Sequence, residues 1–176
     1  MSWVVKLKSW RAERGFNKRT YVLKTEVSNL LEECTEYLRA ETEHDSIDAL
    51  CDIVVFSVNA LSYLGKDKVT IYPHYPIYPY NIYNILIDIG KLESSDRIAC
   101  YESIINYSKT IIDSMGYDFT KCMEETVAEI SSRKQDPEQA LKWKIQGGNI
   151  TGEKWQKNRN QYPSTLYKAN YIIAKQ

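Results

Sequence analysis

The stretch DALCDIVVFSVNALSYLG, residues 48–65, most constrains what this chain can fold into. On a helix, which turns about 100° per residue, its apolar side chains form a stripe and cover much of the remaining surface. Such a helix is expected to be buried. Asp48, Asp52 and Asn59 nevertheless share one narrow edge of it, because they are spaced by four and seven residues. Two carboxylates in so apolar a setting need compensation, since an uncompensated buried charge costs several kcal/mol.

Other segments also have helical periodicity. The predicted helices span about 25–42, 46–64, 95–115 and a segment that opens near residue 118. In the first, the residues predicted to share a face are Val27, Leu30, Leu31, Cys34 and Leu38. In the second, Asp45 or Ser46 is the expected N-cap and Gly65 the expected C-cap. A short helix is expected over 81–92.

Two segments are not expected to continue these helices. Pro73, Pro76 and Pro79 exclude a continuous helix, so residues 71–83 are expected to form a Tyr/Pro-rich loop. The polar, glycine-containing C-terminus predicts an irregular arm over about 135–176. The chain is therefore expected to be one all-α domain over 1–176, a bundle of four to five helices with its core at about 25–134.

Composition favours a cytoplasmic protein without nucleic-acid or membrane partners. Lys plus Arg number 23 and Asp plus Glu number 23, so bulk charge indicates no polyanionic partner. No run approaches the ~18 apolar residues of a membrane span, and the N-terminus lacks the features of a signal peptide. The four cysteines are scattered singly, which indicates core thiols and not a zinc site.

The helix before the apolar one supplies two more carboxylates. Glu33 and Glu36 lie three residues apart and project from one face. The connection ETEHDS is short, so the two helices are expected to be antiparallel neighbours, with these glutamates beside Asp48 and Asp52. Four converging carboxylates need a cation, and oxygen ligands suit Mg²⁺ or Mn²⁺ best. The structural alternative is a bundle whose acidic residues are solvated or paired with Lys and Arg.

With these motifs the sequence resembles the MazG-like all-alpha nucleoside triphosphate pyrophosphohydrolases. In that superfamily an ExxE motif on one helix and an ExxD or DxxxD motif on the next hold Mg²⁺. EECTE and DALCDIVVFSVNALSYLG fit the variant that reads D-A-x-x-D, with Asn59 at a later amide position. CMEETVAEISSRK, GEKWQKNRN and LYKANY resemble later signatures of phage-type members. The resemblance covers most of the chain from about Trp10; Ala49 and Asn170 depart from the commonest form, which has Glu and Asp there.

The resemblance implies an enzyme that hydrolyses a nucleoside or deoxynucleoside triphosphate to the monophosphate and pyrophosphate. The implied setting is the cytoplasm of a bacterium or a phage-infected cell. The proposed Mg²⁺ ligands are Glu33, Glu36, Asp48 and Asp52. The general base is one of the acids, with Glu33, Glu36 and Asp52 as catalytic candidates and neighbouring Glu32 as another.

Candidate substrate contacts follow from the charge of a triphosphate and the shape of a base. Basic groups are expected to stabilise the leaving pyrophosphate. The candidates are Arg133, Lys134, Lys154 and Lys157. Asn59 could bind a base or sugar, and Trp10 could stack on a base. Each has a structural alternative: a solvated surface cation, an amide in a buried polar network, or a packing indole.

Other functions and assemblies stay open. The rivals are a catalytically degenerate nucleotide-binding or sensor protein and a phosphoribosyl-ATP pyrophosphohydrolase-like enzyme. Helices that serve a site on one face and stay apolar on the other usually need a partner subunit, so a homodimer or homotetramer is expected, as the resemblance also implies. The Tyr/Pro-rich loop is expected to cover a subunit interface in preference to the pocket.

Overall fold

The computed structural model describes residues 2–13, 15–16, 19–73, 81–132 and 167–176. Their helices are α1 (Trp3–Glu13), α2 (Leu23–Arg39), α3 (Glu43–Tyr63), α4 (Ile82–Lys91), α5 (Arg97–Ser114), α6 (Phe119–Ser132) and the 3₁₀ helix η2 (Tyr171–Ala174). Within this part of the chain there is no β-strand, which confirms the all-α class. The described residues form six α-helices, more than the predicted four to five, because the apolar residues of α1 are spread around it and gave no periodic signal.

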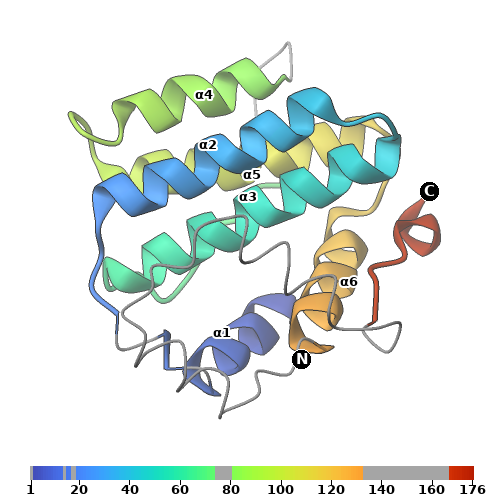
Figure 1. Ribbon diagram of the computed structural model, residues 1–176, viewed down its shortest axis with the longest axis horizontal. Helices are drawn as coiled ribbons and strands as arrows, with labels where there is room; N and C mark the ends of the chain where they lie inside the picture. Colours follow the sequence, from blue (N-terminus) through green and yellow to red (C-terminus); the bar gives the residue numbers. More distant parts are fainter. Residues whose placement is uncertain (1, 14, 17–18, 74–80, 133–166) are drawn as a thin grey trace, which may run out of the picture.

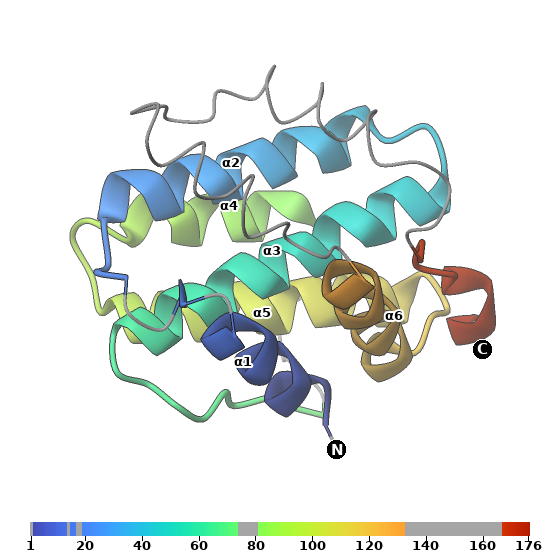
Figure 2. The ribbon, with the colours of Figure 1, turned by 60° about the horizontal axis from the view of Figure 1, so that its bottom comes forward.

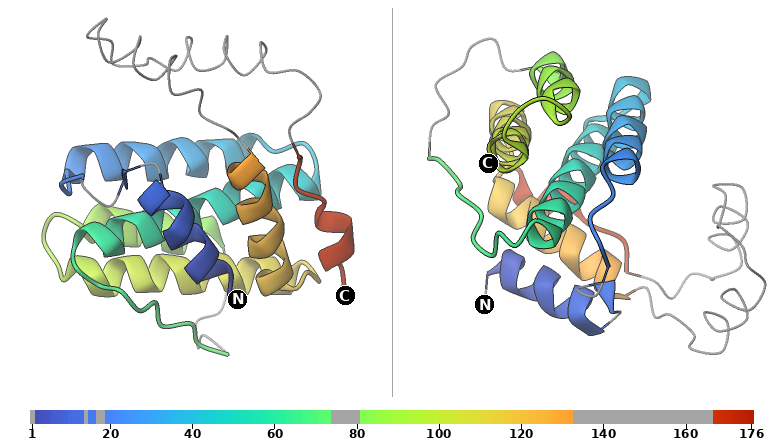
Figure 3. Two further views of the ribbon diagram at one scale, coloured as in Figure 1. Left: turned by 90° about the horizontal axis from the view of Figure 1, so that it is seen from below. Right: turned by 90° about the vertical axis from the view of Figure 1, so that its left-hand side faces the viewer.

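Helix α3 is the centre of the bundle. It packs against α2, α5 and α6, and α4 covers α5 and α2 from the other side (Figure 1). Helices α2 and α3 run antiparallel, as the short connection between them predicted. Helices α1 and α6 lie side by side and cross the long axis of the other four (Figures 2 and 3). Leu50, Ile53 and Val54 of α3 are therefore completely buried.

The buried stripe of α2 differs from the predicted one. Its buried residues are Glu26, Leu30, Glu33 and Cys34. Leu31 and Leu38, predicted on the same face, are 43% and 58% exposed. Positions 26, 30, 33 and 34 lie one or two helical turns apart, so they form the one face of α2 that is buried against its neighbours. Two glutamates thus occupy positions that hydrophobicity alone would give to leucines.

Capping residues fix both ends of α3. Thr42 is the N-cap, and not Asp45 or Ser46: its hydroxyl accepts the Asp45 N–H at 3.1 Å, while the Asp45 carboxylate accepts the Thr42 N–H at 3.2 Å. The prediction placed the cap too late because Asp45 acts from the third helical position of a capping box. At the other end Gly65 follows the C-cap Leu64 with φ of 80°, a conformation that favours glycine.

The remaining elements follow the predicted boundaries within a few residues. Helix α4 spans 82–91 within the expected 81–92, and α5 begins after its N-cap Asp96. The core extends beyond the predicted 25–134, since Trp3, Leu7, Tyr171 and Ala174 are buried in it. Most of the Tyr/Pro-rich loop (74–80) and most of the predicted arm (133–166) lie outside the described residues.

One helix, α3, departs from the expectation that no segment is apolar enough to span a membrane. By length and composition it is apolar enough to cross a membrane, because an average over a helix tolerates a few charges. Within its most apolar window, 61% is buried inside the described fold. The buried central helix of a helical bundle has the same length and apolar composition.

The capping box yields a stability prediction. Thr42→Ala should lower the free energy of unfolding by about 1 kcal/mol, because it leaves a helical N–H without its partner. Thr42→Ser keeps a hydroxyl at the cap and should restore most of the loss. Urea denaturation followed by circular dichroism measures both variants. Equal stability of Thr42→Ala and the wild type would show that this cap contributes nothing.

Candidate functional site

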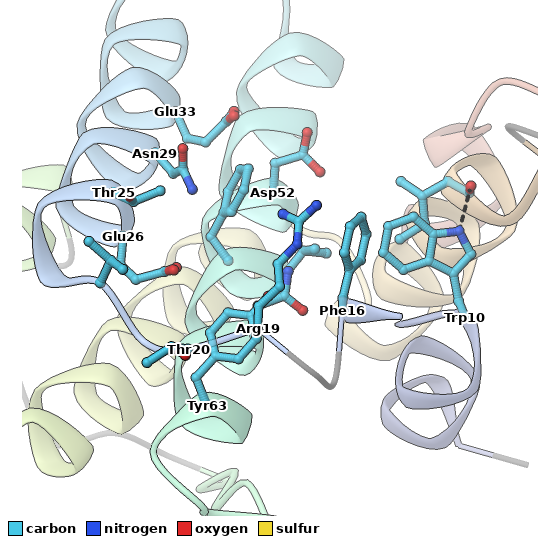
Figure 4. Close-up of a pocket in the computed structure, with 15 residues that line it drawn as sticks. Trp10, Phe16, Arg19, Thr20, Thr25, Glu26, Asn29, Glu33, Asp52 and Tyr63 are labelled. Carbon is cyan, nitrogen blue, oxygen red and sulfur yellow. Dashed lines mark hydrogen bonds between the residues drawn. The ribbon is translucent and has the colours of Figure 1, made fainter. Parts of the chain in front are cut away.

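A pocket of about 620 Å³ lies between α2, α3 and the segment that precedes α2 (Figure 4). Its volume is in the range of small-molecule sites. It is lined by Trp10, Phe16, Arg19, Thr20, Val22, Thr25, Glu26, Asn29, Glu33, Asp52, Val55, Phe56, Asn59, Tyr63 and Ile130. Four residues proposed from the sequence are among these: Trp10, Glu33, Asp52 and Asn59. Acidic, amide and aromatic side chains therefore share one hollow.

Glu33 of α2 and Asp52 of α3 lie near each other at one end of the pocket, and the Glu33 side chain extends towards α3 (Figure 4). Glu33 is only 8% exposed, and its Oε2 atom is buried without a hydrogen-bond partner. Burial, together with the charges of neighbouring acids of which Asp52 has the largest effect, raises the pKa of Glu33 to about 9. An ionised carboxylate is costly here, so the site favours either a proton or a cation on Glu33.

The other two proposed ligands lie close to Glu33 but do not line the pocket. Glu36 is exposed on the next turn of α2. Asp48 is half-buried on α3, and its Oδ1 accepts a hydrogen bond from the Tyr171 hydroxyl at 2.7 Å. The charges of both raise the pKa of Glu33. The structure thus brings all four acids into one electrostatic neighbourhood, with only Glu33 and Asp52 in the pocket itself.

These acids do not form a complete coordination sphere. Among the described residues no group of three or more His, Cys, Asp or Glu side chains is arranged to hold a metal ion. Like charges repel, so carboxylates gather at ligand distance only around a cation. The donor set nevertheless fits a hard divalent ion, because such ions prefer carboxylate oxygens and the buried Glu33 Oε2 has no hydrogen-bond partner. Glu33 and Asp52 are therefore the pair best placed to hold Mg²⁺.

The two proposed substrate contacts that are described both line the pocket. Asn59 lines the pocket, and its Oδ1 atom is buried without a hydrogen-bond partner. The Trp10 Nε1–H donates to the Ile130 carbonyl at 2.9 Å, and the indole thereby ties α1 to α6. Trp10 thus has the structural role that was its alternative, while its ring remains on the pocket wall. Arg133, Lys134, Lys154 and Lys157 lie outside the described residues.

Sequence reasoning missed several pocket residues, some of which had a detectable signal. Asn29 and Glu26 precede Glu33 by four and seven residues, so they lie on the same face of α2. Tyr63 follows Asn59 by four residues on α3 in the same way. Extending the acidic edges by helical spacing would have found these three. Phe16 and Arg19 come from outside the long helices, where no periodicity applies.

Besides Glu33 and Asp52, the surroundings of the pocket carry charged residues of both signs. Glu26 is buried, and burial raises the pKa of its carboxyl while the charges of Arg11 and Arg19 oppose that rise. The exposed Arg19 guanidinium carbon lies 4.2 Å from the centre of the Phe16 ring. Arg11 is buried with its guanidinium carbon 4.6 Å from the centre of the Tyr63 ring. Among the described residues, Arg19 is thus the cation on the pocket wall.

Comparison with models of protein families, with curated proteins and with solved structures gives no match for this chain.

The burial of Glu33 predicts an unusual dependence of stability on pH. Without divalent ions the folded protein keeps a proton on Glu33 up to about pH 9, whereas the unfolded chain loses it near 4.5. The folded state therefore binds more protons over this interval. The free energy of unfolding should fall as pH rises through it, by up to about 1.4 kcal/mol per pH unit. Stability should be highest below the unfolded value and lowest above the folded one.

Two variants separate this effect from other titrations. Glu33→Gln should flatten the fall, because the amide carries no proton that titrates. Glu32→Gln changes the exposed neighbour and should keep it. Urea denaturation in EDTA at a series of pH values measures all three proteins. Identical pH profiles for wild type and Glu33→Gln would contradict a protonated Glu33.

Proposed function

We propose that this chain is a Mg²⁺-dependent nucleotide pyrophosphohydrolase of the MazG-like kind. It would cleave a nucleoside or deoxynucleoside triphosphate to the monophosphate and pyrophosphate in the cytoplasm of a bacterium or a phage-infected cell. The observation that carries the proposal is Glu33, a buried carboxyl group that lies near Asp52 at the wall of a pocket of about 620 Å³ and has one oxygen without a hydrogen-bond partner. The sequence motifs that contain both residues support the same activity.

The proposal explains why the chain keeps acids at apolar positions. Glu33 occupies the buried stripe of α2, where a leucine would stabilise the fold without any electrostatic cost. A bound Mg²⁺ would balance the carboxylates and supply the positive charge that lets a triphosphate approach them. Glu33 and Asp52 would hold the ion from facing helices, with Glu36 and Asp48 completing the set from the adjacent turns.

The chain's own residues have distinct roles in the proposed hydrolysis. One of Glu33, Glu36 and Asp52 orients the attacking water and accepts its proton. The Arg19 guanidinium stabilises negative charge on the leaving pyrophosphate from the pocket wall. The Asn59 amide binds a polar edge of the base or sugar through its unpartnered Oδ1. Phe16 and Trp10 offer aromatic faces at the same pocket.

A second candidate function is a nucleotide-binding or sensor protein without turnover. The observation that favours it is the incomplete coordination sphere among the described residues. Such a protein would bind a nucleotide and gain thermal stability from it, without releasing pyrophosphate. A phosphoribosyl-ATP pyrophosphohydrolase-like activity uses the same bond cleavage and differs only in the substrate.

Catalysis and its dependence on Asp52 are tested together. The wild type should release pyrophosphate from at least one of the common ribo- and deoxyribonucleoside triphosphates with Mg²⁺ or Mn²⁺. Asp52→Asn should abolish most of that release and most of the Mg²⁺-dependent rise in melting temperature, because it removes an anionic ligand. Without metal, the variant should be as stable as the wild type or more stable, since Asp52 opposes the ionisation of Glu33 more than any other neighbouring charge does.

An exposed aspartate, Asp67, provides the control for this test. Asp67→Asn changes an aspartate whose side chain is 91% exposed and should leave hydrolysis unchanged. If Asp52 instead belonged to a structural ion pair, Asp52→Asn would destabilise the metal-free protein by about 3–5 kcal/mol. That loss, with a wild type that ignores Mg²⁺, would contradict the proposed site. Binding without pyrophosphate release would favour the sensor.

We further propose that the protein is a homodimer, or a homotetramer built from such dimers. Helices α2 and α4 pack beside each other, and both carry large exposed apolar side chains. Leu31 and Leu38 lie seven residues apart on α2, and Tyr83 and Ile87 lie four apart on α4. Each pair therefore shares one face of its helix. An apolar surface of this kind is typical of a subunit interface.

A single charge on this surface tests the assembly. Ile87 is 56% exposed, so Ile87→Glu should leave the subunit folded while it shifts the protein towards a 20.5 kDa monomer. Val5→Glu adds the same charge at an exposed position of α1 and should leave the oligomer intact. Size-exclusion chromatography with light scattering measures the mass. A wild type that already elutes as a monomer would reject the proposed dimer.

A further inference from the structure

The last ten residues of the chain return to the acidic edge of α3. The Asp118 N–H donates to the Ala174 carbonyl at 2.8 Å, and the Gln176 N–H donates to the Gly116 carbonyl at 2.8 Å. Ala174 is completely buried. In Figure 2 this segment, with η2, lies beside α6 at one end of the bundle. Main-chain hydrogen bonds and a buried side chain thus anchor the segment independently of its contacts with the acidic residues.

Tyr171 is the residue of this segment that reaches Asp48. It is 4% exposed, and its hydroxyl donates to Asp48 Oδ1 at 2.7 Å, across 123 positions of sequence. The same hydroxyl oxygen lies 3.0 Å from the hydroxyl of Thr126 on α6, which is 2% exposed. Three separate parts of the chain therefore meet in one buried hydrogen-bonded row.

The protons in this row can be assigned from the chemistry of its members. The carboxylate of Asp48 only accepts, and a charged acceptor forms the stronger bond, so the phenol proton points at Asp48. The single Thr126 hydroxyl proton has two acceptors at 3.0 Å, the Cys122 carbonyl and the phenol oxygen, and where it points at the phenol it strengthens the phenol as a donor.

We propose that Tyr171 is a positioning residue for Asp48: its hydrogen bond holds that carboxylate in the orientation in which it joins Glu33 and Asp52 around a divalent cation. This inference rests on the proposed function. Asp48 is half-buried and lies one helical turn from Asp52, so repulsion between them favours rotation of Asp48 towards solvent. A hydrogen bond from a rigidly held phenol opposes that rotation. Carboxylates that bind metals are commonly oriented by such hydrogen bonds.

The inference explains why the C-terminal segment is anchored where it is. Asn170 stands where the family resemblance led us to expect an aspartate, so this position offers no carboxylate of its own. Its backbone N–H instead donates to the Glu125 carboxylate at 2.9 Å, and the next residue inserts its ring. The segment therefore acts on the site through a hydroxyl donor, and tight cation binding requires the C-terminal segment to be docked against the bundle.

Tyr171→Phe tests the inference, because it deletes one hydroxyl and keeps the ring. In the nucleotide-free full-length protein, isothermal titration with MgCl₂ should show an affinity about 10- to 100-fold weaker than in the wild type. The Mg²⁺ concentration needed for half-maximal pyrophosphate release should rise in parallel. Tyr117→Phe is the matched control: Tyr117 is 1% exposed and donates to Glu43, which is not a proposed ligand, at 2.9 Å.

The control separates an effect on the cation from an effect on folding. Tyr117→Phe should lose a similar amount of thermal stability and keep wild-type Mg²⁺ affinity. Equal Mg²⁺ affinity of Tyr171→Phe and the wild type would overturn the inference and leave the proposed function standing. Equal weakening by both variants would overturn it as well, because the effect would then be structural. A wild type that neither binds Mg²⁺ nor releases pyrophosphate would overturn both.

A second pair of variants decides the matter if Tyr171→Phe does not fold. Thr126→Val keeps the shape of the side chain and removes the hydroxyl that supports the phenol, so Mg²⁺ affinity should fall by a smaller factor. Thr126→Ser keeps a hydroxyl and should restore it. Wild-type affinity in Thr126→Val, with the circular dichroism spectrum unchanged, would overturn the inference.

Discussion

The cost of burying negative charge between α2 and α3 governs the arrangement of this protein. Glu33 sits in the apolar stripe of α2, lies near Asp52 of α3 and leaves one oxygen without a partner. A bundle of this size has a net stability of only about 5–15 kcal/mol, so an uncompensated carboxylate at this place would consume a large part of it. The fold meets this cost by holding a proton on Glu33, and the proposed function meets it with a divalent cation.

The rest of the structure can be understood as the support of that pair. A capping box at its start and a glycine turn at its end define where α3 begins and ends, and so help to set the positions of Asp48 and Asp52 relative to α2. Helices α1 and α6 cross the bundle and are joined by the hydrogen bond from Trp10 to Ile130. The C-terminal segment adds a phenol that holds Asp48. Each support comes from a different part of the chain, so the acidic site depends on the complete fold.

The proposed chemistry needs a pocket that accepts a phosphate chain at one end and a base at the other. Glu33 and Asp52 provide anionic oxygens for a cation, and Arg19 provides a positive charge on the same wall. Asn59 and the aromatic rings of Phe16 and Trp10 provide polar and flat surfaces nearby. No single residue among these is diagnostic. Their convergence in a hollow of about 620 Å³ is what favours a nucleotide over a purely structural role for the acids.

The sequence by itself determined helices α2 to α6, the antiparallel pairing of α2 and α3 and the acidic edge of α3, because spacing along a helix fixes which side chains share a face. The same rule would have extended the site to Asn29 and Tyr63. Only the tertiary structure decided which glutamate of EECTE is buried, since hydrophobic periodicity had assigned Leu31 and Leu38 to the buried face of α2. It alone decided that α1 closes one side of the bundle and that Tyr171 reaches Asp48. Those contacts join residues far apart in the chain, and no local pattern encodes a hydrogen bond across 123 positions.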